Sequence, residues 1–370
     1  TAEQLWKFME TDLTEAITSG KLTSKTSLED RDGGTRATLE AARCLLGKIY
    51  LYQEKYADAK SELEKVISSG KYDLIADVST FYHPASAGCK EYVLECVRHY
   101  DPSNMYSQEG WFGILANWGF GYGFIAGPEA SMHYKFNTTS GYSYFNPSKS
   151  LYDAFVAEEG ADGYRLNAWI RTWEQVIAMN IAVNTTTNKY ASEGYFRLKW
   201  LASTDDEFVG YWCGNQSNTP VIRYADVLLM AAEACLQAGD QAGADEYLGR
   251  VRDRARLPRK SHVTLSDIKL ERRLELAMEG MRFQDLKRWG DAPAVLADKG
   301  KKLPTFQIVP DPNNDLTTAA GIYNARYTTK TTYVDNEKSL AGWTPNRDEW
   351  LPFPENELEV NSNLKQNPGY

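Results

Sequence analysis

Residues 270–290 read LERRLELAMEGMRFQDLKRWG, and this stretch decides the fold that we expect. Its apolar residues recur at steps of three and four positions, at Leu270, Leu274, Ala277 and Met281, which is the spacing of one face of a helix. The stretch therefore predicts one continuous amphipathic helix that packs on its neighbours through this face.

Charged residues fill the other faces of this predicted helix. The spacing lets Arg272 meet Glu275 and lets Glu279 meet Arg282, and such pairs contribute about 0.2–0.5 kcal/mol each on an exposed helix surface. We therefore expect these side chains to be solvated. The charged residues of the stretch are Glu271, Arg272, Arg273, Glu275, Glu279 and Arg282.

A helical repeat unit lies earlier in the chain. Leu46, Gly47, Tyr50, Ala59 and Leu63 fall at the spacings of the tetratricopeptide pattern L-G-x-x-Y followed by A-x-x-x-F. Glycine and alanine at these places let two antiparallel helices approach closely, and the larger residues fill the groove between them. The pattern predicts a helix pair.

A second, weaker copy is in register with the first, across helices expected near 221–238 and 241–256. Ala232 takes the place of Gly47, and Ala244 and Leu248 take the places of Ala59 and Leu63. Such units cannot bury their apolar faces alone, so they must stack. The fold class is therefore predicted as all-α, with tetratricopeptide-type repeats and further helical layers at 2–20 and 266–289. The expected apolar face of the first of these layers is Leu5, Phe8, Met9, Leu13 and Ile17.

Between the two repeat copies, the chain changes character. Residues 92–212 are rich in aromatic residues, Gly, Asn, Ser and Thr, and helical periodicity is largely lost. Within residues 111–145, aromatic residues alternate with Gly and small polar residues. Long irregular segments are either functional or disordered, and disorder disfavours aromatic residues. We therefore interpret this segment as a folded binding loop.

The composition of the loop suits carbohydrate. A sugar ring needs a flat aromatic platform with amide and carboxylate groups beside it, and Trp and Tyr supply this at little cost in rotamer entropy. Asn117, Glu129 and Asn137 are candidates to bind hydroxyl groups. The alternative is that the aromatic residues form a satellite core that pins the loop to the helices. The candidates for stacking are Trp111, Trp118, Tyr122, Phe124, Tyr134, Tyr142 and Tyr144.

Further tryptophans continue the aromatic excess, and we rank them below the loop residues. The second-rank candidates for ligand contact are Trp169, Trp173, Trp200 and Trp212, whereas Trp343 and Trp350 are interpreted as packing residues.

Composition excludes some classes of function. The chain has 370 residues, of which 42% are hydrophobic and 25% charged, and its net charge is −9. Nucleic-acid binding needs clustered Lys and Arg, which this chain lacks. No apolar run approaches the roughly 20 residues of a membrane helix.

No catalytic, metal or cofactor site is predicted. The carboxylates Glu158, Glu159 and Asp162 lie in a charged turn and single out no pair for glycoside hydrolysis. Residues 311–322 begin like a calcium loop but lack its Gly and final Glu. Five cysteines contain no C-x-x-C pair, and the sequence leaves open a disulfide between Cys89 and Cys96.

Four ordered blocks of the C-terminal half resemble the SusD/RagB family. They are RYADVLLMAAEA at 223–234, RVRDRARL at 250–257, the stretch at 270–290, and LPFPENELEVNSNLKQNPGY at 351–370. Four blocks in order make a more specific resemblance than one short motif. The segment NPSKSLYDAFVAEEGADGYRL at 146–166 also resembles a family block, one that follows a ligand-binding loop.

The resemblance implies a surface lipoprotein of Bacteroidetes that captures a glycan, without catalysis, for a SusC-like TonB-dependent outer-membrane transporter. The family site lies on variable aromatic loops over the repeat scaffold, so no named sugar-binding residue transfers to this chain. Two alternatives stay open: a peptide- or protein-binding repeat protein of the RagB type, and an endo-glycosidase. The implied location is the outer membrane at the cell surface, through an N-terminal lipid that this chain does not contain.

The resemblance also implies the domain organisation. We expect one SusD-like domain over residues 1–370 that lacks the family's N-terminal stretch, so that the sequence is a fragment. Within it we expect N-terminal repeat helices at 1–70, an irregular ligand-binding insertion at 71–219, and C-terminal repeat helices with a tail at 220–370.

Overall fold

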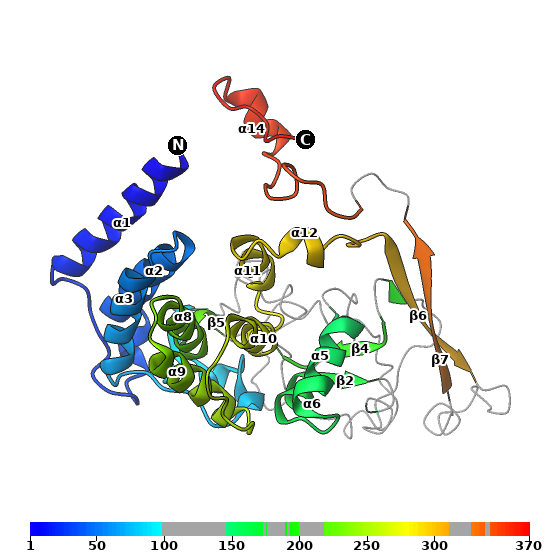
Figure 1. Ribbon diagram of the computed structural model, residues 1–370, viewed down its shortest axis with the longest axis horizontal. Helices are drawn as coiled ribbons and strands as arrows, with labels where there is room; N and C mark the ends of the chain where they lie inside the picture. The colour runs from blue at the N-terminus through cyan, green and yellow to red at the C-terminus, as the bar shows by residue number, and fades with distance from the viewer. Residues whose placement is uncertain are drawn as a thin grey trace, which may run out of the picture.

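The computed structural model describes residues 1–97, 146–172, 175, 189–190, 193–199, 218–310, 327–336 and 341–370. Its main body is helical, and a long β-hairpin extends from one side of it (Figure 1). The helices are α1 Ala2–Thr18, α2 Leu39–Tyr52, α3 Tyr56–Ser68, α5 Lys149–Glu159, α6 Tyr164–Trp169, α8 Tyr224–Gln237, α9 Gln241–Arg254, α10 Leu265–Glu275, α11 Arg282–Arg288, α12 Ala292–Val295 and α14 Glu355–Val360.

Both predicted repeat pairs are present, α2 with α3 and α8 with α9. In the first pair, the side chain of Thr38 accepts a hydrogen bond from Ala41 N and starts α2. A Cβ added at Gly47 would lie 2.8 Å from Leu63 Cγ on α3, so this glycine permits the close approach that its pattern predicted. Ala59 and Leu63 are fully buried in the same contact.

Helix α8 is the centre of the stack, because it packs against α2, α3, α9 and α10. Every residue from Tyr224 to Cys235 is buried, including the predicted contact residue Ala232. Ala244 and Leu248 of α9 close on it from one side. Helices buried all round occupy the interior of a fold, and the main hydrophobic core therefore follows α8.

Helix α1 forms where it was predicted, but its apolar face is only partly covered. A capping box between Thr1 and Gln4 starts the helix, which packs on α2. Leu5 and Phe8 remain 58% and 61% exposed, so the prediction that they pack in a layer is wrong for the described residues.

The predicted continuous helix at 270–290 is broken. Helix α10 ends at Glu275, Met278 and Gly280 adopt positive φ angles of 65° and 81°, and α11 begins at Arg282. A right-handed helix cannot continue through two such residues. The helix therefore ends at this turn, and Leu274 and Ala277 pack together in one hydrophobic cluster.

The fold is helical and tetratricopeptide-like, but it is not all-α. The described residues also form three small antiparallel sheets, with strand orders β1-β5, β2-β4 and β3-β6-β7. These strands were not predicted from the sequence, because most are too short for a clear two-residue period. The strands are β1 Tyr92–Cys96, β2 Ile170–Thr172, β3 Lys189–Tyr190, β4 Tyr195–Arg197, β5 Thr219–Arg223, β6 Lys302–Pro310 and β7 Tyr327–Asp335.

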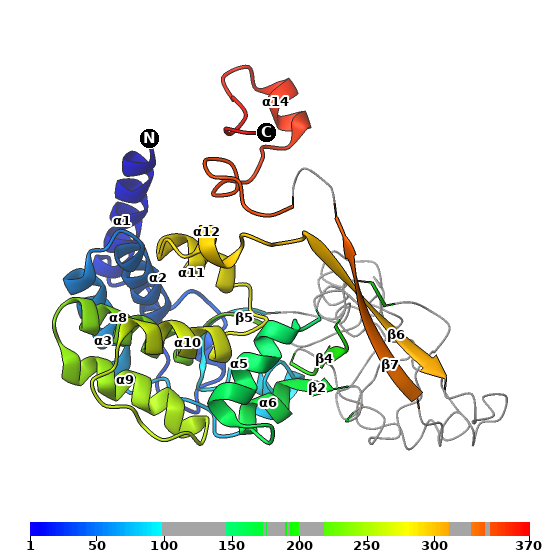
Figure 2. The same cartoon turned by 45° about the vertical axis from the view of Figure 1, so that its right-hand side comes forward.

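A second hydrophobic cluster lies beside the first, around Phe155 of α5 and Trp169 of α6. Leu274 of α10 belongs to this cluster, so α10 connects the repeat helices with the α5–α6 region (Figure 2). The C-terminal helix α14 lies apart from both clusters and buries no residue. None of the described helices combines the length and the apolar character needed to cross a lipid bilayer.

Candidate functional site

The predicted stacking residues all lie in 98–145, outside the described residues, as do Asn117, Glu129 and Asn137. The same holds for the second-rank candidates Trp173, Trp200 and Trp212 and for the calcium-like loop at 311–322. The residues in question are Trp111, Trp118, Tyr122, Phe124, Tyr134, Tyr142 and Tyr144. Their role stays a prediction.

The structure does describe the segments that border this insertion, which we call the frame. Strand β1 leads into 98–145, and α5 and α6 follow it. Strands β2 and β4 border residues 173–192, and β5 follows residues 200–217. The frame thus contains each point at which the aromatic-rich region joins the helical body.

Two strand pairs bring these junctions together. β1 pairs with β5, and Cys96 lies opposite Thr219, so the start of one segment meets the end of another. β2 pairs with β4, and Thr172 lies opposite Tyr195. Each pair joins chain segments that are distant in sequence.

Beneath these pairs lies a group of ten charged side chains in continuous contact, which we call the buried ionic cluster. It contains the five carboxylates and five cations Glu91, Glu159, Glu271, Glu275, Glu279, Arg165, Lys199, Arg223, Arg252 and Arg254.

Glu275, at the end of α10, is its centre. One carboxylate oxygen lies 3.0 Å from Arg165 Nη1, and the other lies 3.1 Å from Arg223 Nη1 and within contact of Arg254. Arg165 comes from α6 and Arg223 ends β5, so Glu275 ties both elements to α10. All of these side chains are almost completely buried.

The outer contacts of the cluster reach the remaining junctions. Glu91, which directly precedes β1, accepts hydrogen bonds from Arg223 at 2.6 Å and Arg254 at 3.1 Å. Lys199, two residues after β4, donates to Glu279 at 2.5 Å and to the carbonyl oxygens of Glu275 and Ala277. The cluster therefore fixes β1, β4, β5 and α6 to one helix.

Burial and opposite charges act against each other at these groups. Burial raises the pKa of Glu275, but Arg254, Arg223, Arg165 and Lys199 more than offset it and hold the pKa well below its usual range. Burial lowers the pKa of Lys199 to about 8, with Glu279 opposing the shift. The Lys199 ammonium also lies 3.8 Å from the centroid of the Trp169 ring.

The expectation that the charges of 270–290 are solvated is therefore wrong for Glu271, Arg272, Glu275 and Glu279, whereas Arg273 and Arg282 are partly exposed. Arg272 pairs with Asp226 of α8 and Asp285 of α11 rather than with Glu275. Glu279 pairs with Arg223 and Lys199 rather than with Arg282.

One signal for this burial is present in the sequence. Glu271, Glu275 and Glu279 repeat at four-residue steps, and like charges at this spacing repel each other unless cations come from elsewhere. The cations come from other elements of the fold, which the sequence alone does not reveal.

The remaining described aromatic candidates divide into two groups. Trp169 is buried in the second cluster, and its Nε1 donates to the carbonyl oxygen of Val78 at 3.0 Å, so it packs rather than faces a ligand. The Trp343 ring lies 6.4 Å from Phe283, as expected of a packing residue. Trp350 was also assigned to packing, but it is 53% exposed.

The carboxylates considered for hydrolysis are used in ion pairs. Glu159 accepts from Arg165 Nε at 2.7 Å, and Glu158 accepts from Arg252 Nη1 at 2.6 Å. Cys89 and Cys96 are both free thiols, so the disulfide left open by the sequence is not formed.

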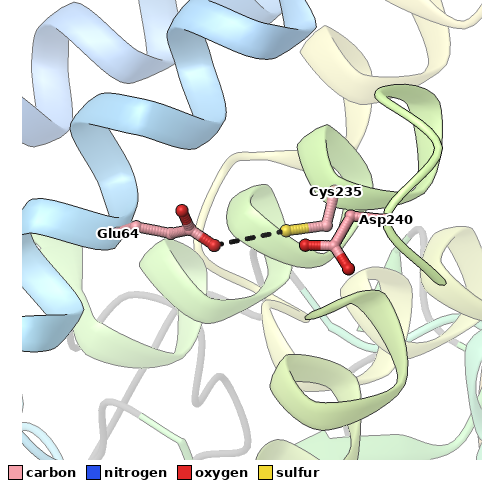
Figure 3. A group of neighbouring side chains, drawn as sticks. All are labelled: Glu64, Cys235 and Asp240. Carbon is pink, nitrogen blue, oxygen red and sulfur yellow. Dashed lines mark hydrogen bonds between the residues drawn. The ribbon is translucent and has the colours of Figure 1, made fainter. Parts of the chain in front are cut away.

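Glu64, Cys235 and Asp240 have three possible metal-ligand atoms within 4.8 Å of one another (Figure 3). Lys60 supplies the positive charge there, because its Nζ lies 2.7 Å from Asp240 and 3.9 Å from Glu64. Burial raises the pKa of Cys235 to about 12, so its thiol is protonated beside Glu64 and Asp240. The group is therefore explained as a polar contact between α3, α8 and the start of α9.

Comparison with known proteins gives the same family throughout. A model of the SusD family matches residues 90–370. The chain is 26% identical over 362 residues to SusD-like protein P2 of Formosa agariphila, covering 89% of this chain and 59% of that protein. It is 31% identical over 170 residues to a SusD-like protein of Bacteroides ovatus, covering 41% of this chain and 29% of that protein. The chain thus spans less than two thirds of these relatives.

Solved structures match the whole chain. A laminarin-binding SusD-like protein superposes with a TM-score of 0.72 and 28% identity, covering 100% of this chain and 69% of that chain. Surface glycan-binding protein A of Bacteroides thetaiotaomicron gives 0.71 and 25%, covering 100% and 71%. The family model extends over more than half of the chain, and on this ground the chain belongs to the SusD family.

Proposed function

We propose that this protein is a cell-surface glycan-binding protein that captures an oligosaccharide for a partner TonB-dependent outer-membrane transporter. The observation that carries the proposal is the match of the whole chain to a SusD-like protein that binds laminarin. Binding without catalysis is part of the proposal, because the relatives are described by what they bind. The transporter and an N-terminal lipid anchor belong to the same proposal.

The fixed position of the frame also supports this function. A weak binding surface gains affinity when its loops are ordered beforehand, because less conformational entropy is lost on binding. The strand pairs and the buried ionic cluster fix the junctions of the aromatic insertion to α10. We propose that the insertion within 71–219 of a single SusD-like domain presents a preformed platform to the sugar.

The proposed ligand contacts are the seven aromatic residues of the insertion. Pairs of stacked aromatic rings contribute about 0.5–1.5 kcal/mol, and we take the same magnitude for a ring stacked on a sugar, so several rings together give modest affinity for a chain of sugar units. The proposed residues are Trp111, Trp118, Tyr122, Phe124, Tyr134, Tyr142 and Tyr144.

A glycan panel tests the proposal. The wild-type chain is compared with a triple variant, Trp118→Ala, Tyr122→Ala and Tyr144→Ala, and with the control Trp350→Ala, which removes an exposed tryptophan of the C-terminal tail. Circular dichroism checks that the helices of each variant are intact. We expect wild type and the control to bind one glycan class and the triple variant to bind it at least about tenfold more weakly.

Two results would reject the proposal. Binding of a peptide pool without binding of any glycan would favour the RagB-type alternative. Slow release of new reducing ends from a bound glycan would favour an endo-glycosidase.

A further inference from the structure

Two half-buried tyrosines of the frame lie close to a third tyrosine on the β6–β7 hairpin. Tyr152 belongs to the first turns of α5, Tyr195 begins β4, and Tyr333 lies on β7. The rings of Tyr152 and Tyr195 stack with centroids 4.5 Å apart and an interplanar angle of 26°. Tyr333 is 49% exposed, which makes its ring available to a ligand.

Glu193 holds these elements together. Its Oε1 accepts a hydrogen bond from the Tyr333 hydroxyl at 2.6 Å, and its Oε2 accepts one from Lys149 N, at the start of α5, at 2.5 Å. The same carboxylate therefore joins the hairpin to α5. An exposed tyrosine ordinarily keeps its rotamer freedom, whereas this one has its hydroxyl fixed before any ligand arrives.

The backbone beside Glu193 confirms that the hairpin is seated here. Gly194 has a φ of +89°, and a Cβ at this position would lie 2.6 Å from the Phe306 ring of β6. Phe306 lies opposite Thr331 in the hairpin, and Tyr333 lies two residues further along β7. Because side chains alternate along a strand, Tyr333 shares the face of the hairpin that meets Gly194.

The surface lies close in sequence to the segments that join the predicted binding insertion to the body. Helix α5 begins three residues after Asn146, where the structure resumes beyond 98–145, and β4 begins two residues after Glu193, where it resumes beyond 191–192. Helix α5 and strand β4 lie side by side on the side of the helical body that carries the hairpin (Figures 1 and 2). The surface is therefore near the points at which the predicted binding insertion joins the body.

The charged groups described beside the tyrosines suit a neutral ligand. They are two cations, Lys149 and Arg273, and two carboxylates, Asp153 and Glu193. The pair between Lys149 and Asp153 is 2.6 Å long and more than half exposed, and such pairs contribute little, so sugar hydroxyls can compete for both partners.

Resting on the proposed function, we infer that Tyr333, the Tyr152–Tyr195 pair and Glu193 form an additional contact surface for neutral pyranose oligosaccharides. The exposed ring of Tyr333 supplies the stacking platform. Glu193 positions that ring, and Lys149 and Asp153 bind hydroxyl groups at its edge.

Calorimetric titration of the full chain tests this inference with five probes: laminarihexaose, cellohexaose, maltohexaose, xylohexaose and an alginate hexasaccharide. The variants are Tyr333→Ala, Tyr333→Phe and the control Tyr370→Ala. Tyr370 matches Tyr333 closely, since it is 44% exposed and donates its hydroxyl to a carbonyl oxygen, but it lies at the C-terminus away from the hairpin. Circular dichroism and melting temperature check that each variant folds.

We expect wild type to bind at least one neutral hexasaccharide, and Tyr333→Ala to bind it about two- to tenfold more weakly. Tyr333→Phe keeps the ring but loses the hydrogen bond to Glu193, so it should bind more weakly than wild type and more tightly than Tyr333→Ala. Tyr370→Ala should stay within about twofold of wild type. The alginate hexasaccharide should bind more weakly than the neutral probe.

Three results would overturn the inference. The first is unchanged binding by Tyr333→Ala, the second is an equal loss in Tyr370→Ala, and the third is a loss in Tyr333→Phe as large as in Tyr333→Ala. If the triple variant of the insertion loses binding while Tyr333→Ala keeps it, this inference fails and the proposed function stands. If wild type binds no glycan at all, both fail.

Discussion

Each charged side chain of the buried ionic cluster has lost nearly all contact with water, and this costs several kcal/mol per ion unless partners offset it. Glu275 shows how the offset is reached, because three guanidinium groups surround one carboxylate. Removal of one charge from such a cluster destabilises a protein more than replacement of all its charges by well-packed apolar residues. Removal of Glu275 would leave Arg165, Arg223 and Arg254 buried with fewer counter-charges.

We therefore expect Glu275→Ala to lower the free energy of unfolding by about 3–5 kcal/mol, the cost of breaking a buried ion pair. Urea denaturation followed by circular dichroism measures it. The matched control is Asp253→Ala, which breaks an ion pair with Arg259 that is about half exposed, and which should cost under about 1 kcal/mol. Similar costs for the two variants would show that the cluster is open to water in solution.

The sequence could not reveal this cluster because its contacts are long-range. Arg254 and Glu91 are 163 residues apart, and Arg165 and Glu275 are 110 apart. Periodicity reports only on neighbours along one helix, so it placed these charges in solvent. The positions of the charges were visible, but their partners were not.

At the scale of elements, the spacing of residues within neighbouring helices predicted the repeat pairs correctly. The spacing of Gly47, Ala59 and Leu63 predicted a close helix pair, and the structure brings these residues into contact. The break between α10 and α11 was missed, although Gly280 marks it, because the apolar period continues through the turn. The longest hairpin was also missed, even though β7 reads YTTKTTYVD, a run rich in β-branched residues.

The role of Gly47 gives a prediction in which two effects oppose each other. Alanine is favoured over glycine in a helix by about 1 kcal/mol, so Gly47→Ala would stabilise an isolated α2. In the folded protein its Cβ would lie 2.8 Å from Leu63 Cγ, and overpacking of this kind costs about 1–3 kcal/mol. We expect net destabilisation, measured as a lower urea midpoint.

The double variant Gly47→Ala, Leu63→Ala separates the two effects. If steric conflict is the cause, the cost of Gly47→Ala should shrink or change sign once Leu63 is shortened. An equal cost in both backgrounds would contradict the assigned contact.

At the scale of the whole molecule, the sequence predicted the helical scaffold, whereas the predicted binding residues lie outside the described residues. Repeat spacing and the four family-like blocks predicted a stacked helical body, and the structure confirms it around α8. The predicted ligand contacts depend on how an irregular segment folds, and no periodicity encodes that. Among the described residues, the Tyr333 hydroxyl donates a hydrogen bond to Glu193, although the two residues are 140 positions apart in the sequence. This contact depends on how the β6–β7 hairpin folds back, which no local pattern predicts.

Burial is distributed very unevenly over the molecule, and this predicts a gradient of local stability. Helix α8 is buried from Tyr224 to Cys235, whereas α14 buries no residue and α1 leaves Leu5 and Phe8 exposed. Segments with few buried contacts open locally at little cost, but those in the centre exchange only on global unfolding. Amides of α8 should exchange at least about a hundredfold more slowly than those of α14.

Hydrogen exchange followed by mass spectrometry measures this gradient, with α10 as the internal reference because it packs on α8 and yet borders the frame. Strong protection of α14 would contradict the expectation, since nothing in the described residues covers that helix. Repeating the measurement at tenfold lower protein concentration then separates two causes. Protection lost on dilution comes from a second copy of the chain, because association follows mass action. Protection that persists means that the tail packs on its own chain more tightly than its exposed side chains indicate.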